Sequence, residues 1–214
     1  MAQAAWVTEL APVPEAPYPP APWIASCQYW AGLFRASRPA SLPRGLRPLL
    51  GSRARVVTVV RYLPGSTLVY DELIVATPVL LGWRPGLYID HIWVDSLASL
   101  WGGRRIWGLP KNLADFTWTD RGVTITDGVG LIIDLALEHP SARGPALPFV
   151  IAGIGRLGER WAWMFAPMRG HLGLQGLRIR AMSPRFGFHL GASPSIAVAS
   201  RASRATFPSP TLIS

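Results

Sequence analysis

The chain has 214 residues and a formal net charge of +9, because 21 Lys and Arg outnumber 12 Asp and Glu. Half of the residues are hydrophobic and 15% are charged, a composition that excludes a disordered chain. The only cysteine, Cys27, excludes an intrachain disulfide and a zinc site built from several cysteines.

The positive charge raises nucleic acid or a membrane surface as partners. However, the sequence has no nucleic-acid motif and no contiguous basic run, and no stretch approaches the roughly 18 apolar residues of a membrane span. Residues 1–22 contain Glu9, Glu15 and six prolines, unlike a secretory signal. We therefore expect a cytoplasmic protein that binds neither nucleic acid nor a membrane.

The N-terminal part of the chain is rich in proline. Residues 1–22 are predicted to form an extended arm that lies over the body of the protein or over a neighbour. Residues 23–34 follow as a first strand. Residues 38–51 combine prolines with a leucine pattern, which predicts a short interrupted helix or a loop with one helical turn.

The rest of the chain is dominated by β patterns. A single helical turn or loop, ending at Gly102-Gly103, is expected over residues 96–103, and residues 202–214 are expected to form a loose tail after a single domain over 23–201. Strands are predicted in the following ranges: 55–62, 66–80, 87–94, 115–118, 123–125, 130–138, 147–154, 173–181, 186–190 and 195–200.

Short strand spacing with few helical patterns is typical of a closed or strongly curved sheet. We therefore predict a mainly β fold of the α+β class, an antiparallel closed or cone-shaped β-barrel with short peripheral helices.

One lysine stands apart from the other cations. Lys111 is the only lysine in the chain, and the remaining basic residues are arginines. It follows Pro110, which fixes its own φ and restricts Leu109, so the backbone leading to the lysine is stiff. Trp107, Leu109 and Leu113 supply apolar walls. This pattern indicates a held, partly desolvated amine, and the alternative is an ordinary surface cation.

The segment around Lys111 resembles the acetoacetate decarboxylase family. Members of that family carry a Gly-Arg…Pro-Lys motif, an upstream Tyr-x-Glu motif, and a Schiff-base lysine directly after the proline. Here Gly103-Arg104…Pro110-Lys111 matches the first motif and Tyr70-Asp71-Glu72 the second, with 39 residues from Glu72 to Lys111. The resemblance covers residues 68–116, about a quarter of the chain.

The resemblance implies a reaction that needs no cofactor or metal. The lysine amine would attack the ketone of a 3-oxo acid such as acetoacetate, and the iminium would accept the electrons released when carbon dioxide leaves. This chemistry requires an uncharged lysine near pH 7, although a free lysine has a pKa of about 10.4. Burial and a neighbouring cation both lower the pKa of a lysine.

The resemblance also assigns roles to other residues. Glu72 would position substrate or shuttle protons, Trp107 would line the pocket, and Arg104 would bind a substrate carboxylate through its planar guanidinium. A surface carboxylate is the alternative for Glu72, and an ion pair with an acid such as Asp95 is the alternative for Arg104. The resemblance further implies a homo-oligomer.

Two positions depart from the family pattern. Founding members have a second lysine directly after the first, and Asn112 occupies that position here, so burial and a nearby arginine would have to activate Lys111. The family pocket also uses an arginine in its first strand, where this chain has Gln28. Aldolase or dehydratase chemistry on a pyruvate-like acid is one alternative, and a non-catalytic barrel that binds small ligands is another.

Overall fold

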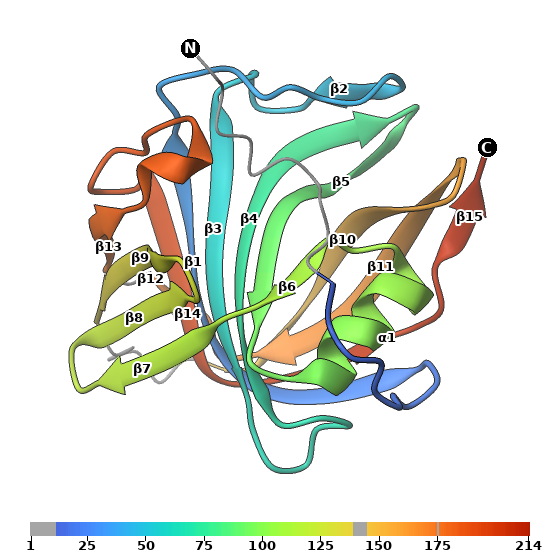
Figure 1. Ribbon diagram of the computed structural model, residues 1–214, viewed down its shortest axis with the longest axis horizontal. Coiled ribbons are helices and arrows are strands. Elements are labelled where there is room, and N and C mark those ends of the chain that lie inside the picture. The colour runs from blue at the N-terminus through green and yellow to red at the C-terminus, as the bar shows by residue number, and fades with distance from the viewer. Residues whose placement is uncertain (1–11, 139–144, 175) are drawn as a thin grey trace.

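Seven strands form a closed barrel in the structure, a computed structural model that describes residues 12–138, 145–174 and 176–214 (Figure 1). They follow one another around the barrel in the order β14-β1-β3-β4-β5-β10-β11, and the pairing of β11 with β14 closes it. Their bounds are β1 (Trp23–Arg35), β3 (Ala54–Tyr62), β4 (Tyr70–Leu81), β5 (Arg84–Val94), β10 (Leu147–Leu157), β11 (Arg160–Gly170) and β14 (Ile196–Phe207). The predicted mainly β barrel is therefore confirmed.

Most neighbouring strands are antiparallel, as expected. The exceptions involve β5, which pairs in parallel with β10 and with the short strand β6 (Lys111–Leu113). The parallel β5–β6 pair is possible because a helix, α1 (Leu97–Trp107), lies between the two strands in the chain. This crossover carries the predicted reactive segment back to the barrel.

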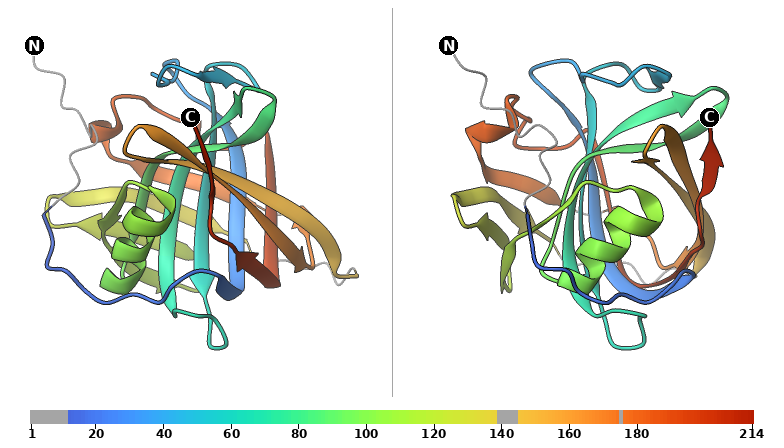
Figure 2. Two further views of the ribbon diagram at one scale, coloured as in Figure 1. Left: turned by 90° about the vertical axis from the view of Figure 1, so that its right-hand side faces the viewer. Right: turned by 45° about the vertical axis from the view of Figure 1, so that its right-hand side comes forward.

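A second sheet covers one outer face of the barrel (Figures 1 and 2). It contains β7 (Asp115–Thr119), β8 (Gly122–Asp127), β9 (Gly130–Leu137) and β13 (Leu177–Met182). Alternate residues of the barrel strands, such as Val57, Val59, Leu73 and Val75, are fully buried against its side chains. Because side chains alternate along a strand, the intervening residues face the barrel interior.

Helix α1 is longer than the single turn that the sequence predicts. Ser96 caps its start by accepting a hydrogen bond from Ser99 N, and Gly108, with a φ of 64°, ends it after 11 residues. Gly102 and Gly103, which suggested a terminus, lie inside the helix because they pack closely against other residues. A Cβ at Gly102 would overlap the Trp23 ring, and one at Gly103 would approach Lys111.

The described part of the proline-rich arm runs along α1 (Figure 2). Trp101 Nε1 donates to Pro14 O at 2.7 Å, and Arg105 Nη2 lies 3.2 Å from Glu15 Oε1. Trp23 Nε1 donates to Pro19 O at 2.9 Å. The arm over residues 12–22 therefore covers the helix that leads to Lys111, and residues 1–11 lie outside the described part.

The structure corrects the expectation of a loose C-terminal tail. Ala202–Phe207 complete β14 beside β1, and β15 (Thr211–Ile213) pairs with β11. Two buried serines, Ser200 and Ser203, and exposed arginines concealed the alternation of β14 in the sequence. The strand β11 was not predicted at all, because Met164, Ala166, Pro167 and Met168 are not typical strand residues.

Two further local predictions were wrong. The segment 186–190 is not a strand: a 3-10 turn, η1 (Pro184–Phe186), precedes a single bridge between Leu190 and Ala36. In the segment 38–51 the regular element is a short strand, β2 (Leu46–Pro48), rather than a helix. The remaining strand, β12 (Gly173–Leu174), is an edge strand beside β14.

Within the described residues, α1 falls short of the length and hydropathy needed to cross a membrane.

Candidate active site

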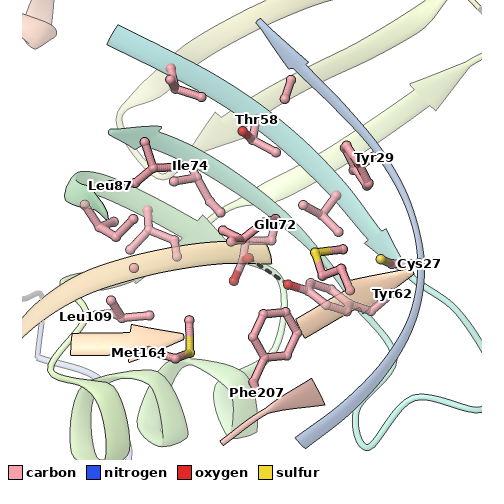
Figure 3. A pocket seen from close by; sticks show the side chains of 18 of the residues that line it. Cys27, Tyr29, Thr58, Tyr62, Glu72, Ile74, Leu87, Leu109, Met164 and Phe207 are labelled. Atoms are coloured by element: carbon pink, nitrogen blue, oxygen red, sulfur yellow. Dashed lines mark hydrogen bonds between the residues drawn. The ribbon is translucent and has the colours of Figure 1, made fainter. Parts of the chain in front are cut away.

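The barrel encloses a cavity of about 330 Å³ (Figure 3). Most of its lining is aliphatic or aromatic, contributed by β1, β3, β4, β5, β10 and β11. The polar side chains in the lining are Cys27, Tyr29, Thr58, Tyr62, Tyr70, Glu72 and Lys111. A few polar groups in a largely apolar concave site are the usual pattern of a small-molecule site.

Lys111 lies in the wall of this cavity at the start of β6. Its residue exposure is 3%, and its Nζ donates to Glu72 Oε2 at 2.6 Å and to Ser99 Oγ at 2.9 Å. The stem of the lysine crosses Gly103 of α1, where a Cβ would come within 2.5 Å of Lys111 Cδ. The glycine in the helix is therefore required for the position of the amine.

Glu72 anchors the other side of the amine from β4. Tyr62 OH donates to Glu72 Oε1 at 3.0 Å, and Tyr70 OH lies 3.4 Å from Oε2. The two tyrosine rings stack with centroids 4.2 Å apart. Burial, and then the Glu72 carboxylate, raise the pKa of both tyrosines well above their usual range, so both hydroxyls remain donors.

Cys27 and Tyr29 complete the polar end of the cavity from β1. Burial, followed by the charge of Glu72, raises the pKa of Cys27 to about 12. Burial also raises the pKa of Tyr29 above its usual range. The thiol is therefore protonated at neutral pH and is a poor nucleophile. Lys111 supplies the amine at this end of the cavity.

The structure brings together three of the predicted site residues. Lys111, Glu72 and Trp107 all line the cavity. Trp107 is held by a hydrogen bond from its Nε1 to Pro208 O at 2.8 Å and by an edge contact with Trp23, whose ring centroid is 4.8 Å away. Its role in the site is an aromatic wall fixed at the end of α1.

Arg104 lies beside the site and is not among the lining residues. Its Nε donates to Lys111 O at 2.8 Å, and its Nη2 donates to Asn112 Oδ1 at 3.2 Å. These bonds hold the backbone of β6. Asp95, the acid suggested as an alternative partner for Arg104, accepts a hydrogen bond from Asp71 N through its Oδ1. The structure therefore places Arg104 behind Lys111, as a fixed cation close to its main chain.

Gln28 is also absent from the lining. Its neighbours Cys27 and Tyr29 line the cavity, and Gln28 pairs across the sheet with Arg61. Side chains alternate along a strand, so Gln28 belongs to the opposite face of β1. Among the lining residues, which all come from the described part of the chain, Lys111 is the only cation.

Sequence reasoning missed two polar groups of the site, Ser99 and Tyr62. Ser99 is fully buried on α1, and no local pattern distinguishes it from an ordinary serine near a helix start. Tyr62 ends a valine-rich strand that was predicted, and only the register with β4, in which Tyr62 pairs with Tyr70, places it next to Glu72.

Comparisons with known proteins agree with this architecture. The family model for acetoacetate decarboxylase matches residues 10–132, more than half of the chain. No curated protein matches this chain. The crystal structure of acetoacetate decarboxylase from Legionella pneumophila subsp. pneumophila str. Philadelphia 1 has a TM-score of 0.67 at 17% identity and covers 97% of this chain and 93% of its own.

Two other solved structures share the fold at low identity. The enduracididine biosynthesis enzyme MppR, complexed with the condensation product of pyruvate and imidazole 4-carboxaldehyde, has a TM-score of 0.62 at 14% identity over 91% of this chain and 90% of its own. An acetoacetate decarboxylase-like enzyme from Sphingomonas wittichii RW1 has a TM-score of 0.57 at 15% identity over 90% and 93%. On the extent of the family match, this chain belongs to the acetoacetate decarboxylase family.

Proposed function

We propose that this protein is a Schiff-base-forming lyase that decarboxylates a 3-oxo acid, with Lys111 as nucleophile and Glu72 as proton shuttle. The observation that carries the proposal is the contact of 2.6 Å between Lys111 Nζ and Glu72 Oε2 in the wall of an apolar cavity. At this distance Glu72 is within hydrogen-bond reach of the amine, so it can accept the amine's proton when substrate arrives.

The reaction follows from these groups. Glu72 takes a proton from Lys111 Nζ, whose lone pair then attacks the ketone carbon. Glu72 gives this proton to the carbinolamine hydroxyl, which leaves as water, so an iminium and the Glu72 carboxylate remain. The bond between the α-carbon and the carboxylate breaks, its electron pair forms the enamine double bond, and the nitrogen takes the iminium π pair as carbon dioxide leaves. Glu72 passes a proton taken up from solvent to the α-carbon, and water releases the ketone product.

The surroundings of Lys111 support decarboxylation. A carboxylate is poorly stabilised in apolar surroundings, whereas in the transition state its charge moves toward the iminium nitrogen. Lys111 is the only cation among the described lining residues. No second cation there would therefore stabilise the reactant carboxylate relative to the transition state. Tyr62 and Tyr70 keep Glu72 in place through both proton transfers.

Aldol or dehydration chemistry on a pyruvate-like acid would use the same iminium. The MppR structures, which contain pyruvate or its condensation product, motivate this second candidate. A non-catalytic barrel that binds small ligands is the third. The proposal also includes a cytoplasmic homo-oligomer, which light scattering on the purified protein and fractionation of cells would test.

Borohydride trapping tests the proposal directly. The protein is incubated with acetoacetate or pyruvate and reduced, and the mass shift is mapped. We expect the adduct on Lys111, which is the only lysine, and carbon dioxide release from acetoacetate. Lys111→Arg should lose both, since a guanidinium stays charged. Absence of an adduct with every carbonyl compound tested would favour the binding barrel, and an adduct without carbon dioxide release would favour aldol chemistry.

A further inference from the structure

We propose that the substrate of this site carries an extended apolar tail, and that the tail lies along β3, β4 and β5 away from Lys111. The inference rests on the proposed function, because it takes the reacting carbonyl to be at Lys111. It names the substrate class as a medium-chain or aryl-substituted 3-oxo acid, in place of the four-carbon acetoacetate.

The strand register shows how the cavity is layered. At the level of Glu72, its partner on β3 is Val60. One step further along the barrel, Thr58, Ile74 and Ile92 lie side by side, and Lys111 is the β6 partner of Ile92. We call the space from this step onward the tail channel, lined by Val56, Thr58, Ile74, Leu87, Ile89, Gly153 and Met164.

The tail channel leads away from the reactive end. Figure 3 shows Leu87 and Leu109 on one side of Glu72, and Cys27, Tyr62 and Phe207 on the other. On β4, the row that contains Val56 and Ile89 is four residues beyond Glu72, which is about 13 Å at ~3.3 Å per residue. The backbone of Lys111 lies in the nearer Ile92 row, but its amine contacts the Glu72 carboxylate, and a four-carbon acid bound to that amine is shorter than this distance.

The lining of the tail channel is apolar except at one residue. Thr58 is its only polar side chain, and none of its residues is charged. Two ionisable residues on the same strand segments, Arg55 and Asp90, are excluded from the cavity lining: Arg55 donates to Ser52 O and Ala54 O, and Asp90 accepts from Thr77 Oγ1 at 2.6 Å. Polar residues are therefore present on these strands but kept out of the channel.

The size of the cavity also favours a substrate longer than a four-carbon acid. Its volume of about 330 Å³ equals roughly eleven water molecules at ~30 Å³ each. A four-carbon acid would leave the tail channel to water, which finds few hydrogen-bond partners there. An alkyl or aryl tail would displace that water and bury apolar surface, so each added methylene strengthens binding until the channel is full.

A matched panel of ketones and acids tests the tail. Wild-type protein is reduced with borohydride in the presence of acetone, 2-heptanone, acetoacetate or 3-oxooctanoate, and adduct on Lys111 is measured against concentration. We expect half-maximal trapping at a concentration at least about tenfold lower for the longer member of each pair. Equal values within each pair would overturn the tail while leaving the Schiff base intact. Absence of any adduct would instead overturn the proposed function and the tail together.

A second arm changes the channel itself. A Cβ at Gly153 would lie 3.3 Å from Met164 Cε, a flexible side-chain end in the channel, so Gly153→Leu should narrow the far end. We expect this variant to lower the ratio of long-chain to short-chain trapping at least about fivefold. Gly128→Leu is the control, because nothing lies within 4 Å of a Cβ at that exposed turn. An unchanged ratio in folded Gly153→Leu protein would count against the channel.

Discussion

Lys111 Nζ and Glu72 Oε2 form an ion pair of 2.6 Å whose side chains are only 3% and 4% exposed. Removing one partner of such a buried ion pair leaves an unpaired buried charge, which destabilises the folded protein by about 3–5 kcal/mol. We expect Lys111→Met and Glu72→Gln each to destabilise the protein by about this amount. The double variant should lose less than the sum, and urea unfolding of all four proteins measures the coupling.

The coupling also separates stability from chemistry. Because Glu72→Gln keeps the amine but removes the base, it should lower the rate of adduct formation by roughly a hundredfold or more even where the protein is fully folded. Strictly additive unfolding energies, or normal trapping by Glu72→Gln, would show that the pair is not the functional unit.

Gly103 should control the position of the amine. A Cβ there would lie within 2.5 Å of Lys111 Cδ and 2.6 Å of Cε, so Gly103→Ala must displace the lysine stem. We expect a roughly ten- to hundredfold slower trapping rate, since small misplacements of reacting groups are costly. Gly128→Ala, where nothing lies within 4 Å of the added atom, is the control. Equal trapping rates in the two folded variants would contradict this role.

The sequence was informative where function depends on local pattern. The Pro110-Lys111 step and the Tyr70-x-Glu72 motif pointed to the pair that the structure joins. Gln28 and Arg104 show the limit of this reasoning, because a strand residue one position away from the cavity face, or a side chain turned toward a backbone carbonyl, is decided by register and packing.

The same limit explains the errors in the fold. Gly102 and Gly103 disfavour a helix when taken alone, yet close approach by Trp23 and Lys111 makes glycine necessary at both positions. The strand β11 has few residues with high strand propensity, and its pairing along β10 is what stabilises it. Long-range contacts outweighed local preference in both cases.

Asn112 accepts a hydrogen bond from Arg104 and lies on the opposite face of β6 from Lys111. A second lysine at this position would therefore adjoin Arg104 rather than the reacting amine. We expect Asn112→Lys to destabilise the protein by about 1 kcal/mol and to leave the rate of adduct formation at Lys111 no higher than in the wild type. Asn112→Ala, which removes the bond without adding charge, is the matched control, and a clear acceleration by Asn112→Lys would refute the expectation.

Cys27 should resist alkylation in the folded protein. Burial, and secondarily Glu72, raise its pKa to about 12, and only the thiolate reacts rapidly. At mildly alkaline pH we expect little labelling by iodoacetamide in buffer and complete labelling in urea, followed by mass spectrometry. Rapid labelling of native protein would mean that the polar end of the cavity opens to solvent.

Asp90 and His91 should give the stability of the protein two opposing pH dependences. Burial raises the pKa of Asp90 from 3.8 to about 6, so its contribution is present below about pH 4 and is lost as the pH rises through 6. Burial, and then Arg55, lower the pKa of His91 from 6.5 to about 4, so its contribution is present above about pH 6.5 and is lost as the pH falls through 4. The two slopes nearly cancel in the wild type.

Replacing either Asp90 or His91 should reveal the pH dependence of stability that the other residue causes. Asp90→Asn should become more stable relative to the wild type between about pH 4 and 6, by roughly 2–3 kcal/mol in total, and His91→Gln should lose stability over the same rise. Urea unfolding at several pH values measures both differences, with Asp115→Asn, which alters an exposed carboxylate, as the control. The free energy of unfolding of Asp90→Asn could instead run parallel to that of the wild type across this pH range. Asp90 would then ionise in the folded protein as readily as in water, and its burial beside Thr77 would not oppose ionisation.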